Sequence, residues 1–331
     1  MVVDVHVHIS ALSAKHGMMS RRLLRSLPFR FMKSRLGLRG EDESTEASLR
    51  HLLIRLLEET PELDAAVVLA FDAVYDESGR LNLNQTHLYT KNDYVIQLAR
   101  QHRKILFGAS IHPYRRDAIE ELERCVRAGA VLVKWLPITQ GMNPADPRCI
   151  AFYEAMAHHG IPLLCHTGGE KSLPNIAPHT ASPLLLVPAL QRGVTVIAAH
   201  CGTRSAWGER DYVPDFMRLC HDWEHFYGDT AALNLPTRSH AYPAILADTV
   251  VRSKLLHGSD WPILPVPPAA QLGLSAAAEC WLEPNWLRRD LMIKRRLGFE
   301  PAYWTRAAEV LRLPDGQLSG SSLPVAASSV S

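Results

Sequence analysis

Residues 161–169 read IPLLCHTGG, and residues 194–202 read VTVIAAHCG. In each stretch an apolar run ends in a histidine, and a glycine follows two residues later. Apolar runs bounded by turn residues are typical of buried β-strands. A histidine at the last position of a buried strand needs a polar partner or a ligand. The two stretches therefore predict strands that carry His166 and His200 at their carboxyl ends.

Similar apolar runs recur along the chain and alternate with helical patterns. Strands are expected at 2–9, 65–71, 104–111, 130–136, 161–166, 194–200, 225–229 and 254–260. Helices are expected at 46–59, 91–101, 116–128, 148–159, 182–191, 214–222 and 242–251. Eight strands in such alternation favour a parallel α/β sheet closed into a single (β/α)8 TIM barrel. An open, doubly wound sheet is the alternative, but no GxGxxG follows any of the strands.

The 331 residues suit one large barrel domain, expected over 1–312. An insertion follows the first strand at about 10–45, and a helical C-terminal extension at 281–311 is broken at Pro301. The extension is expected to close one end of the barrel. Residues 313–331 are rich in Ser, Gly and Ala, and they are predicted to form a flexible tail.

Composition excludes several classes of protein. With 47% hydrophobic and 21% charged residues, the chain is not disordered throughout, and its net charge of +2 argues against a nucleic-acid binder. No apolar run approaches the ~20 residues that cross a bilayer, and the first residues do not resemble a signal peptide. Six cysteines without a CxxC pair are typical of reduced thiols, so a cytoplasmic location is expected.

The insertion is strongly basic. Residues 15–39 contain eight Lys and Arg and no acid, which gives +8 and leaves the rest of the chain at −6. Leucines and Phe31 interleave with the arginines, so a short amphipathic helix is expected. This segment could lie on an anionic membrane or nucleic acid, remain solvated, or pack on a second subunit in a homodimer. The hypothesis that suits a barrel best is a lid over the site, with one arginine binding an anionic substrate.

Metal-capable residues gather at the predicted strand ends. The first strand carries His6 and His8, whose side chains share one face because they are two residues apart. His166, His200 and Asp260 each end a later strand. The carboxyl ends of barrel strands meet at one face, where active sites are built. This ligand set suits Zn²⁺, with Mn²⁺ or another divalent ion as the alternative, and one or two ions per chain.

This arrangement resembles the amidohydrolase superfamily, and more narrowly its amidohydrolase-related branch, which includes aminocarboxymuconate-semialdehyde decarboxylase. The resemblance rests on HxH in strand one, His166-Thr-Gly168, Ala199-His-Cys-Gly202 and Gly258-Ser-Asp-Trp-Pro262. The segment from Gly129 to Pro147, which contains Lys134, also resembles strand four of that branch. The resemblance covers the chain from about Val2 to Pro262.

The resemblance implies that His6, His8, His166 and Asp260 hold the metal. His200 would bind a second ion, or act beside a single one. Some superfamily members carboxylate a strand-four lysine that bridges two metals, and Lys134 is the residue in that position. Alternatively, Lys134 stays unmodified and binds a substrate carboxylate or forms an ion pair. The neighbouring motifs favour one metal and an unmodified lysine.

The expected reaction is hydrolysis of a small-molecule amide, lactone or other ester-like bond. A bound dication lowers the pKa of its water to roughly 7. Asp260 would act as general base and then general acid, and His200 would contact the oxyanion. Other substrate contacts are expected from residues on the catalytic face: Lys134, Glu170, Arg204 and His112. A metal-dependent carbon–carbon lyase (a decarboxylase or hydratase of a small carboxylic acid) is the first alternative, and a non-catalytic barrel scaffold is the second.

Overall fold

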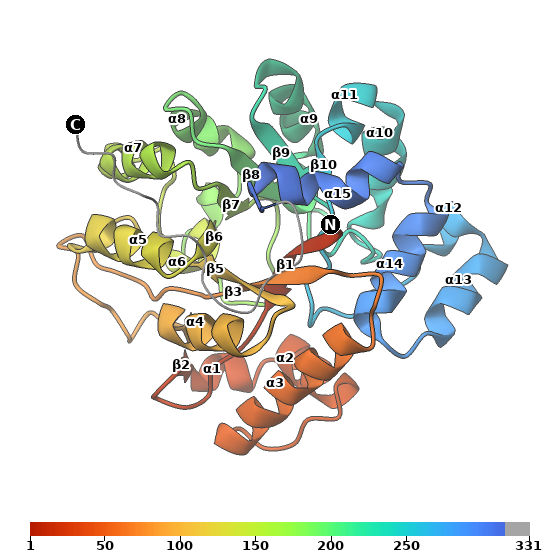
Figure 1. Cartoon of the computed structure of the whole chain (residues 1–331), viewed down its shortest axis with the longest axis horizontal. Coiled ribbons are helices and arrows are strands. Elements are labelled where there is room, and N and C mark those ends of the chain that lie inside the picture. The colour runs from red at the N-terminus through yellow and green to blue at the C-terminus, as the bar shows by residue number, and fades with distance from the viewer. Residues whose placement is uncertain (315–331) are drawn as a thin grey trace.

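A computed structural model describes residues 1–314. Eight parallel strands form a TIM barrel with helices around it, as the sequence predicted (Figure 1). In sheet order they are β1 (Val3–His8), β3 (Ala65–Leu69), β5 (Ile105–Ala109), β6 (Ala130–Trp135), β7 (Leu163–His166), β8 (Val196–Ala199), β9 (Phe226–Asp229) and β10 (Leu255–Leu256). A second sheet pairs β2 (Gly17–Met19) with β4 (Leu88–Thr90).

Backbone hydrogen bonds bring the last strand segment back to the first. The Val5 amide donates to the His257 carbonyl at 2.9 Å, and the Asp260 amide donates to the His6 carbonyl at 2.8 Å. A parallel bridge joins Val7 to Trp261. Asp260 therefore lies beside β1, although more than 250 positions separate them in the sequence.

Most of the helices cover the outside of the barrel, and three of those named below lie across its ends. The helices are α1 (Arg21–Leu24), α2 (Leu27–Arg35), α3 (Glu43–Glu58), α4 (Asn92–Gln101), α5 (Ala118–Arg127), α6 (Pro137–Gln140), α7 (Ile150–His159), α8 (Val187–Leu190), α9 (Val213–Asp222), α10 (Tyr242–Ala247), α11 (Thr249–Arg252), α12 (Ala269–Leu272), α13 (Leu274–Leu282), α14 (Trp286–Arg296) and α15 (Pro301–Val310). Short 3-10 helices are η1 (Pro147–Cys149), η2 (Pro178–Thr180), η3 (Pro183–Leu186), η4 (His200–Gly202) and η5 (Ser239–Ala241).

Two predicted helices differ in detail. The helix expected at 242–251 is divided, because Asp248 takes an extended conformation and caps α11 with its side chain. The helix expected at 182–191 begins as the 3-10 helix η3, with Pro183 at its start. The C-terminal region contains α13, α14 and α15, and begins earlier than the sequence pattern indicated.

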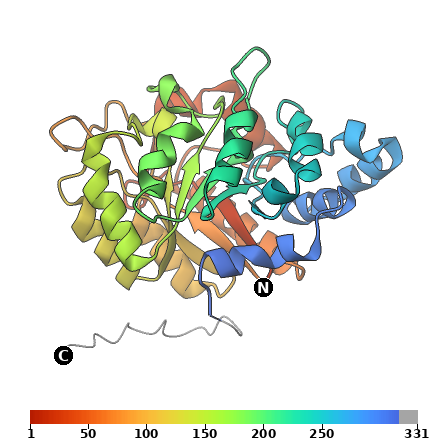
Figure 2. The same ribbon diagram turned by 90° about the horizontal axis from the view of Figure 1, so that it is seen from above.

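The two ends of the barrel are closed by different segments. Ala307 and Leu311 pack with Val3 and Val5 inside the barrel, so the region of α15 closes the end where the strands begin. Figure 2 shows α15 across the end that carries the N-terminus, with α1 and α2 at the opposite end. The C-terminal extension therefore closes one end, as expected. Of the predicted tail, residues 315–331 lie outside the described residues.

The insertion folds because its polar residues cap short helices. Ser20 accepts from the Leu23 amide at 3.2 Å, Ser26 accepts from the Phe29 amide at 3.4 Å, and Asp42 caps α3. Such caps stabilise helices of this length, which are marginal by themselves. We call residues 17–35, which contain β2, α1 and α2, the hood.

Long-range contacts hold the hood to the barrel. Strand β2 pairs antiparallel with β4, with Gly17 opposite Thr90. A Cβ on Gly17, whose φ is +155°, would lie 1.9 Å from the Tyr89 carbonyl oxygen, so the close pairing requires glycine. Buried Glu46 of α3 accepts from the Leu12 amide at 2.7 Å and fixes the chain before the hood.

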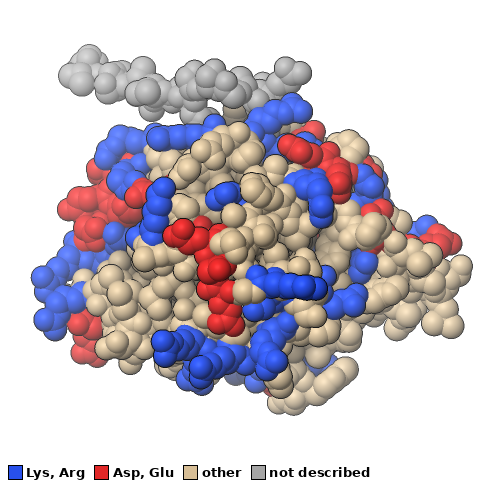
Figure 3. All heavy atoms as spheres, turned by 90° about the horizontal axis from the view of Figure 1, so that it is seen from below, with Lys and Arg blue, Asp and Glu red and all other residues tan. Residues whose placement is uncertain are grey.

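The basic side chains of the insertion lie on its outer surface. Of the eight Lys and Arg in residues 15–39, seven are exposed and Lys33 is half-buried. Figure 3 looks onto the side of the barrel that carries α1 and α2, and it shows Lys and Arg gathered along the lower edge. These charges are therefore solvated.

Leu164 provides a test of the barrel core. Its side chain is fully buried among apolar residues of neighbouring strands, including Leu132 and Ile197. We expect Leu164→Ala to lower the free energy of unfolding by about 2–5 kcal/mol, measured by urea denaturation, because it leaves a cavity. Leu274→Ala is the control: this leucine is 82% exposed, and a change within about 0.5 kcal/mol is expected. Equal effects of the two substitutions would contradict the packing described.

Candidate metal centre

Three ligand-type atoms converge at the carboxyl end of β1. His6 Nε2 lies 3.1 Å from His8 Nε2, and Asp260 Oδ1 lies 3.3 Å and 3.2 Å from these two nitrogens. Ligands of a tetrahedral metal with bonds of about 2.0–2.2 Å stand about 3.3–3.6 Å apart. The three atoms thus have the chemistry and nearly the separations of one face of such a site.

Asp229, at the end of β9, orients His6. Its Oδ2 accepts from His6 Nδ1 at 2.7 Å, and its Oδ1 accepts from the amides of His200 and Ala231. Because Nδ1 carries the proton, Nε2 of the neutral ring presents its lone pair to His8 and Asp260. Carboxylates commonly hold metal-binding histidines in this way.

Two site residues adopt left-handed backbone conformations. The φ angle is +62° at His200 and +64° at Asp260. Non-glycine residues seldom occupy this region, and where they do the surrounding structure holds them there. His200 directly follows β8, and Asp260 lies four residues after the end of β10. The sharp turn at each residue keeps its side chain at the barrel mouth.

His166 and His200 flank the cluster. Their ring centroids lie 4.7 Å apart, and that of His200 lies 5.1 Å from that of His6. His200 Nδ1 donates to the Ala231 carbonyl at 2.8 Å, whereas His166 Nε2 donates to the Gly169 carbonyl at 3.2 Å. In the neutral ring of His200, Nε2 therefore carries a lone pair. That atom suits a metal ligand or proton acceptor, and it could donate to an oxyanion only after gaining a proton.

Lys134, in β6, contacts the cluster from the interior of the barrel. Lys134 Nζ lies 3.2 Å from His6 Nε2, and its side chain is 1% exposed. Burial lowers the pKa of Lys134, while the carboxylates of Asp229 and Asp260 act in the opposite direction. Lys134 is thus buried behind the histidines, and it does not line the cavity described below.

Burial also sets the charge of the histidines and carboxylates. It lowers the pKa of His6, His166 and His200 well below the usual value, so these rings are neutral at pH 7, the form that binds a metal. Burial acts to raise the pKa of Asp260, but the basic side chains around it, Lys134 among them, outweigh burial and hold that pKa below its usual value. Asp260 is therefore ionised at neutral pH.

A cavity of about 270 Å³ opens above the cluster. His8, His166, His200 and Asp260 line it from the barrel, and Glu170 lines it from the loop after β7. Residues of the hood line the other side of the cavity. None of the arginines of the hood lines the cavity, in contrast to the arginine contact that the sequence suggested.

Glu170 is buried and is held by backbone amides. It accepts from Leu173 at 3.0 Å and from Ser172. Burial raises the pKa of Glu170, and Arg238 acts to lower it. Gly168, with φ +82°, lets this loop approach the loop after β8, because a Cβ there would lie 2.2 Å from the Thr203 carbonyl oxygen.

Arg238 is a site-region residue that sequence reasoning missed. It is 4% exposed, and it donates to the Thr203 carbonyl at 2.8 Å and to the Gly169 carbonyl at 2.7 Å. It therefore ties together the loops that follow β7 and β8. Its only sequence signal is its position after a barrel strand, which many other residues share.

His112 and Arg204 lie away from the cavity. His112 is buried, and its Nε2 contacts the Gln140 carbonyl at 3.1 Å. Arg204 lies over the Trp207 ring, 5.2 Å from its centroid, and 4.0 Å from Asp211. Neither side chain is among those that line the cavity.

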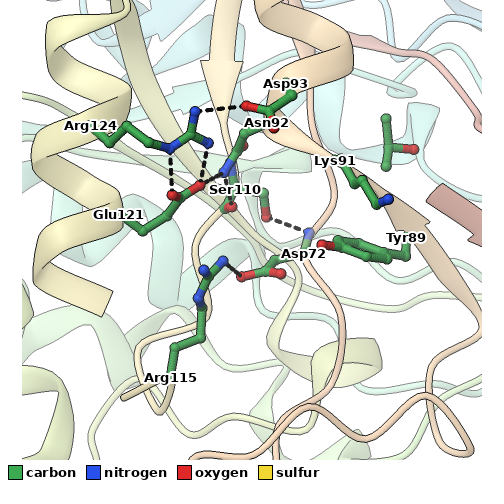
Figure 4. Close-up of a pocket in the computed structure, with 10 residues that line it drawn as sticks. Asp72, Tyr89, Lys91, Asn92, Asp93, Ser110, Arg115, Glu121 and Arg124 are labelled. Carbon is green, nitrogen blue, oxygen red and sulfur yellow. Dashed lines mark hydrogen bonds and ion pairs between the residues drawn. The ribbon is translucent and has the colours of Figure 1, made fainter. Parts of the chain in front are cut away.

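A second hollow, of about 350 Å³, lies beside α4 and α5 (Figure 4). Its charged groups pair with one another: Arg124 bonds to Asp93 and Glu121, and Arg115 bonds to Asp72. Asp72 also accepts from the His112 amide at 2.7 Å. The charged groups of this hollow are thus engaged in ion pairs that connect neighbouring helices and loops.

Comparison with protein families identifies the chain. The family model described as Amidohydrolase matches residues 3–289. The chain belongs to the amidohydrolase family. Members of this superfamily are enzymes that act on small molecules, and they typically depend on divalent metals. The comparison with curated proteins found no match.

Solved structures share the fold of this amidohydrolase. An uncharacterized TIM-barrel protein from Bordetella bronchiseptica is 18% identical, with a TM-score of 0.58 over 90% of this chain and 99% of that one. A 2,6-dihydroxybenzoate decarboxylase from Rhizobium is 14% identical, with a TM-score of 0.55 over 94% and 98%. A probable 2-pyrone-4,6-dicarboxylic acid hydrolase from Acinetobacter baumannii, with citric acid bound, is also 14% identical, with a TM-score of 0.53 over 94% and 99%. At these identities the likeness concerns the fold.

Within residues 1–314, no helix of the amidohydrolase has both the length and the apolar character to cross a membrane.

Proposed function

We propose that this amidohydrolase is a metal-dependent hydrolase of a small-molecule lactone, ester or amide. The observation that carries the proposal is the position of Asp260. Its carboxylate lies within 3.3 Å of both histidine nitrogens and also lines the cavity. One group can therefore contact the ion and a substrate.

His6, His8 and Asp260 would hold the ion, and His166 and His200 would flank it. The donor set of two imidazoles and a carboxylate fits Zn²⁺ or another divalent first-row metal. When bound, such an ion acts as a Lewis acid on a carbonyl and lowers the pKa of water. Lys134, buried behind His6, is proposed to remain unmodified with one ion bound.

The residues of the chain would then handle the proton. Asp260, ionised at neutral pH, takes a proton from the attacking water and returns it to the leaving group. His200 is held by the Ala231 carbonyl with Nε2 unprotonated, which suits a ligand or a proton acceptor. The hood limits the access of bulk water to this chemistry.

A decarboxylase or hydratase would use the same cluster with a substrate carboxylate on the ion. The cavity lining favours hydrolysis, because it offers no Lys or Arg among residues 1–314 to bind an acidic substrate. A scaffold without catalysis would not need an ionised carboxylate facing the cavity.

Metal removal tests the proposal. We expect the purified protein to contain a divalent ion by elemental analysis and to hydrolyse members of a panel of neutral lactones and esters. Chelation should lower the rate by at least about a hundredfold, and added Zn²⁺ should restore it, because the metal supplies several kcal/mol of transition-state stabilisation. Release of CO₂ from aromatic acids without any hydrolysis would instead identify a lyase. Absence of both bound metal and turnover would favour the scaffold.

A further inference from the structure

We infer that the hydrolase takes neutral substrates with an apolar body, held between the metal cluster and the hood. This inference rests on the proposed hydrolysis and adds the substrate class to it. It follows from the lining of the cavity, the positions of the nearby cations and the way in which the hood is attached.

The cavity has one polar side and an otherwise apolar wall. Of its 22 lining residues, 15 are apolar, and the polar ones gather around the metal cluster and Glu170. From the hood, Met19, Leu23, Phe29 and Met32 face the cavity, while the basic residues of the hood are turned to solvent or half-buried. An apolar group of the substrate would gain from burial here.

The charges of the lining disfavour a free acid on the part of the substrate that lies away from the ion. The charged residues of the lining are Glu170 and Asp260, both acidic, and no Lys or Arg joins them in the described part of the chain. The nearby buried cations lie behind the lining: Arg238 donates to the Thr203 and Gly169 carbonyls, and Lys134 lies behind His6. A carboxylate placed against the apolar wall would lose its hydration without gaining a partner.

The hood is attached firmly enough to define this wall. The pairing of β2 with β4 and the bonds from Glu46 to the amides of Leu12 and Ser13 anchor both the hood and the chain before it. Leu23 is 1% exposed and packs with Phe71 and Leu136 of the barrel loops. The wall is thus formed by residues that are already packed.

A series of γ-lactones tests the inference on the metal-loaded protein. From γ-butyrolactone through γ-hexalactone to γ-octalactone, we expect kcat/KM to rise about fourfold for each methylene that reaches the wall. 5-Oxotetrahydrofuran-2-carboxylate should react at least about tenfold more slowly than the neutral lactone of the same shape, 5-acetyldihydrofuran-2-one, because its charge must be desolvated beside Glu170. A kcat/KM that does not change with the length of the alkyl chain, or that is higher for the carboxylate, would overturn the inference.

A charge added to the wall should reverse this preference. We expect Met32→Arg to raise kcat/KM for the carboxylate about tenfold and to lower it for γ-octalactone by a similar factor. Leu27→Arg is the matched control, because Leu27 belongs to the same helix, is 78% exposed and does not line the cavity. Identical behaviour of the two variants would contradict the role given to the wall.

Binding separates this inference from the proposed reaction. 3-Alkylcyclopentanones resemble the γ-lactones but cannot be hydrolysed. Calorimetry should show tighter binding as the alkyl chain lengthens, with 3-oxocyclopentane-1-carboxylate binding more weakly. If the ketones follow this order while no lactone is hydrolysed, the proposed function fails and the substrate class stands. If lactones are hydrolysed without any dependence on chain or charge, only the substrate class fails.

Discussion

Replacing Asp260 by asparagine is expected to lower kcat for hydrolysis by about a thousandfold, because general acid–base groups contribute about 10²–10⁴ in rate. The amide cannot accept the proton that the carboxylate would take from water. It also removes the anionic member of a cluster in which Asp260 Oδ1 lies 3.2 Å from His8 Nε2. The rate is measured at saturating metal, so that weaker metal binding does not imitate the loss of proton transfer.

The control for this substitution is Asp222→Asn. Asp222 is an exposed residue at the end of α9, where the chain enters β9, whereas the cluster lies at the carboxyl ends of the strands. We expect its kcat to match that of the unaltered protein. If Asp260→Asn retained kcat within threefold with metal bound, Asp260 could not be the general base.

Replacing Asp229 by asparagine is expected to weaken metal binding about 10–100-fold without removing any ligand. Asparagine keeps an oxygen for the amides of His200 and Ala231, but it then directs its NH₂ group at His6 Nδ1, where Asp229 Oδ2 now accepts at 2.7 Å. His6 would move its proton to Nε2, and this nitrogen could no longer bind the ion. Asp229 is thus a positioning residue.

Competition with a chelating dye measures this effect directly. The dissociation constant for Zn²⁺ should rise in Asp229→Asn, and excess Zn²⁺ should recover most of the activity, whereas Asp260→Asn should stay inactive. Thermal unfolding of the metal-free proteins provides the stability control. An unchanged affinity in a folded Asp229→Asn protein would show that the bond to His6 does not set its tautomer.

The barrel could be predicted because the sequence patterns that indicate its strands and helices each lie within a short stretch of the chain. Each strand is a short apolar run, and each helix lies between two such runs, so the alternation is visible without long-range contacts. The places where the prediction was inaccurate are also local in origin. Asp248 divides a continuous helical pattern by capping a new helix, and Pro183 starts a 3-10 turn.

The cluster could be anticipated for the same reason. His6 and His8 share a strand face, and His166, His200 and Asp260 end strands, so parallel topology alone brings them to one end of the barrel. The sequence could not show which of them approach most closely. His6, His8 and Asp260 do so because Asp260 follows the strand that returns to β1, and its amide bonds to the His6 carbonyl. His112 ends a strand in a similar way, but its ring is bonded to Gln140 instead.

The sequence by itself determined the strands, the barrel and the end at which the cluster lies, because these depend on neighbouring residues and on a repeated topology. Only the tertiary structure decided what surrounds the cluster. The pattern of the insertion shows leucines and arginines in alternation, but not which of them face the barrel. That choice depends on the pairing of β2 with β4 and on Glu46, contacts between residues more than 30 positions apart. They turn the apolar side of the hood inward and its arginines to solvent.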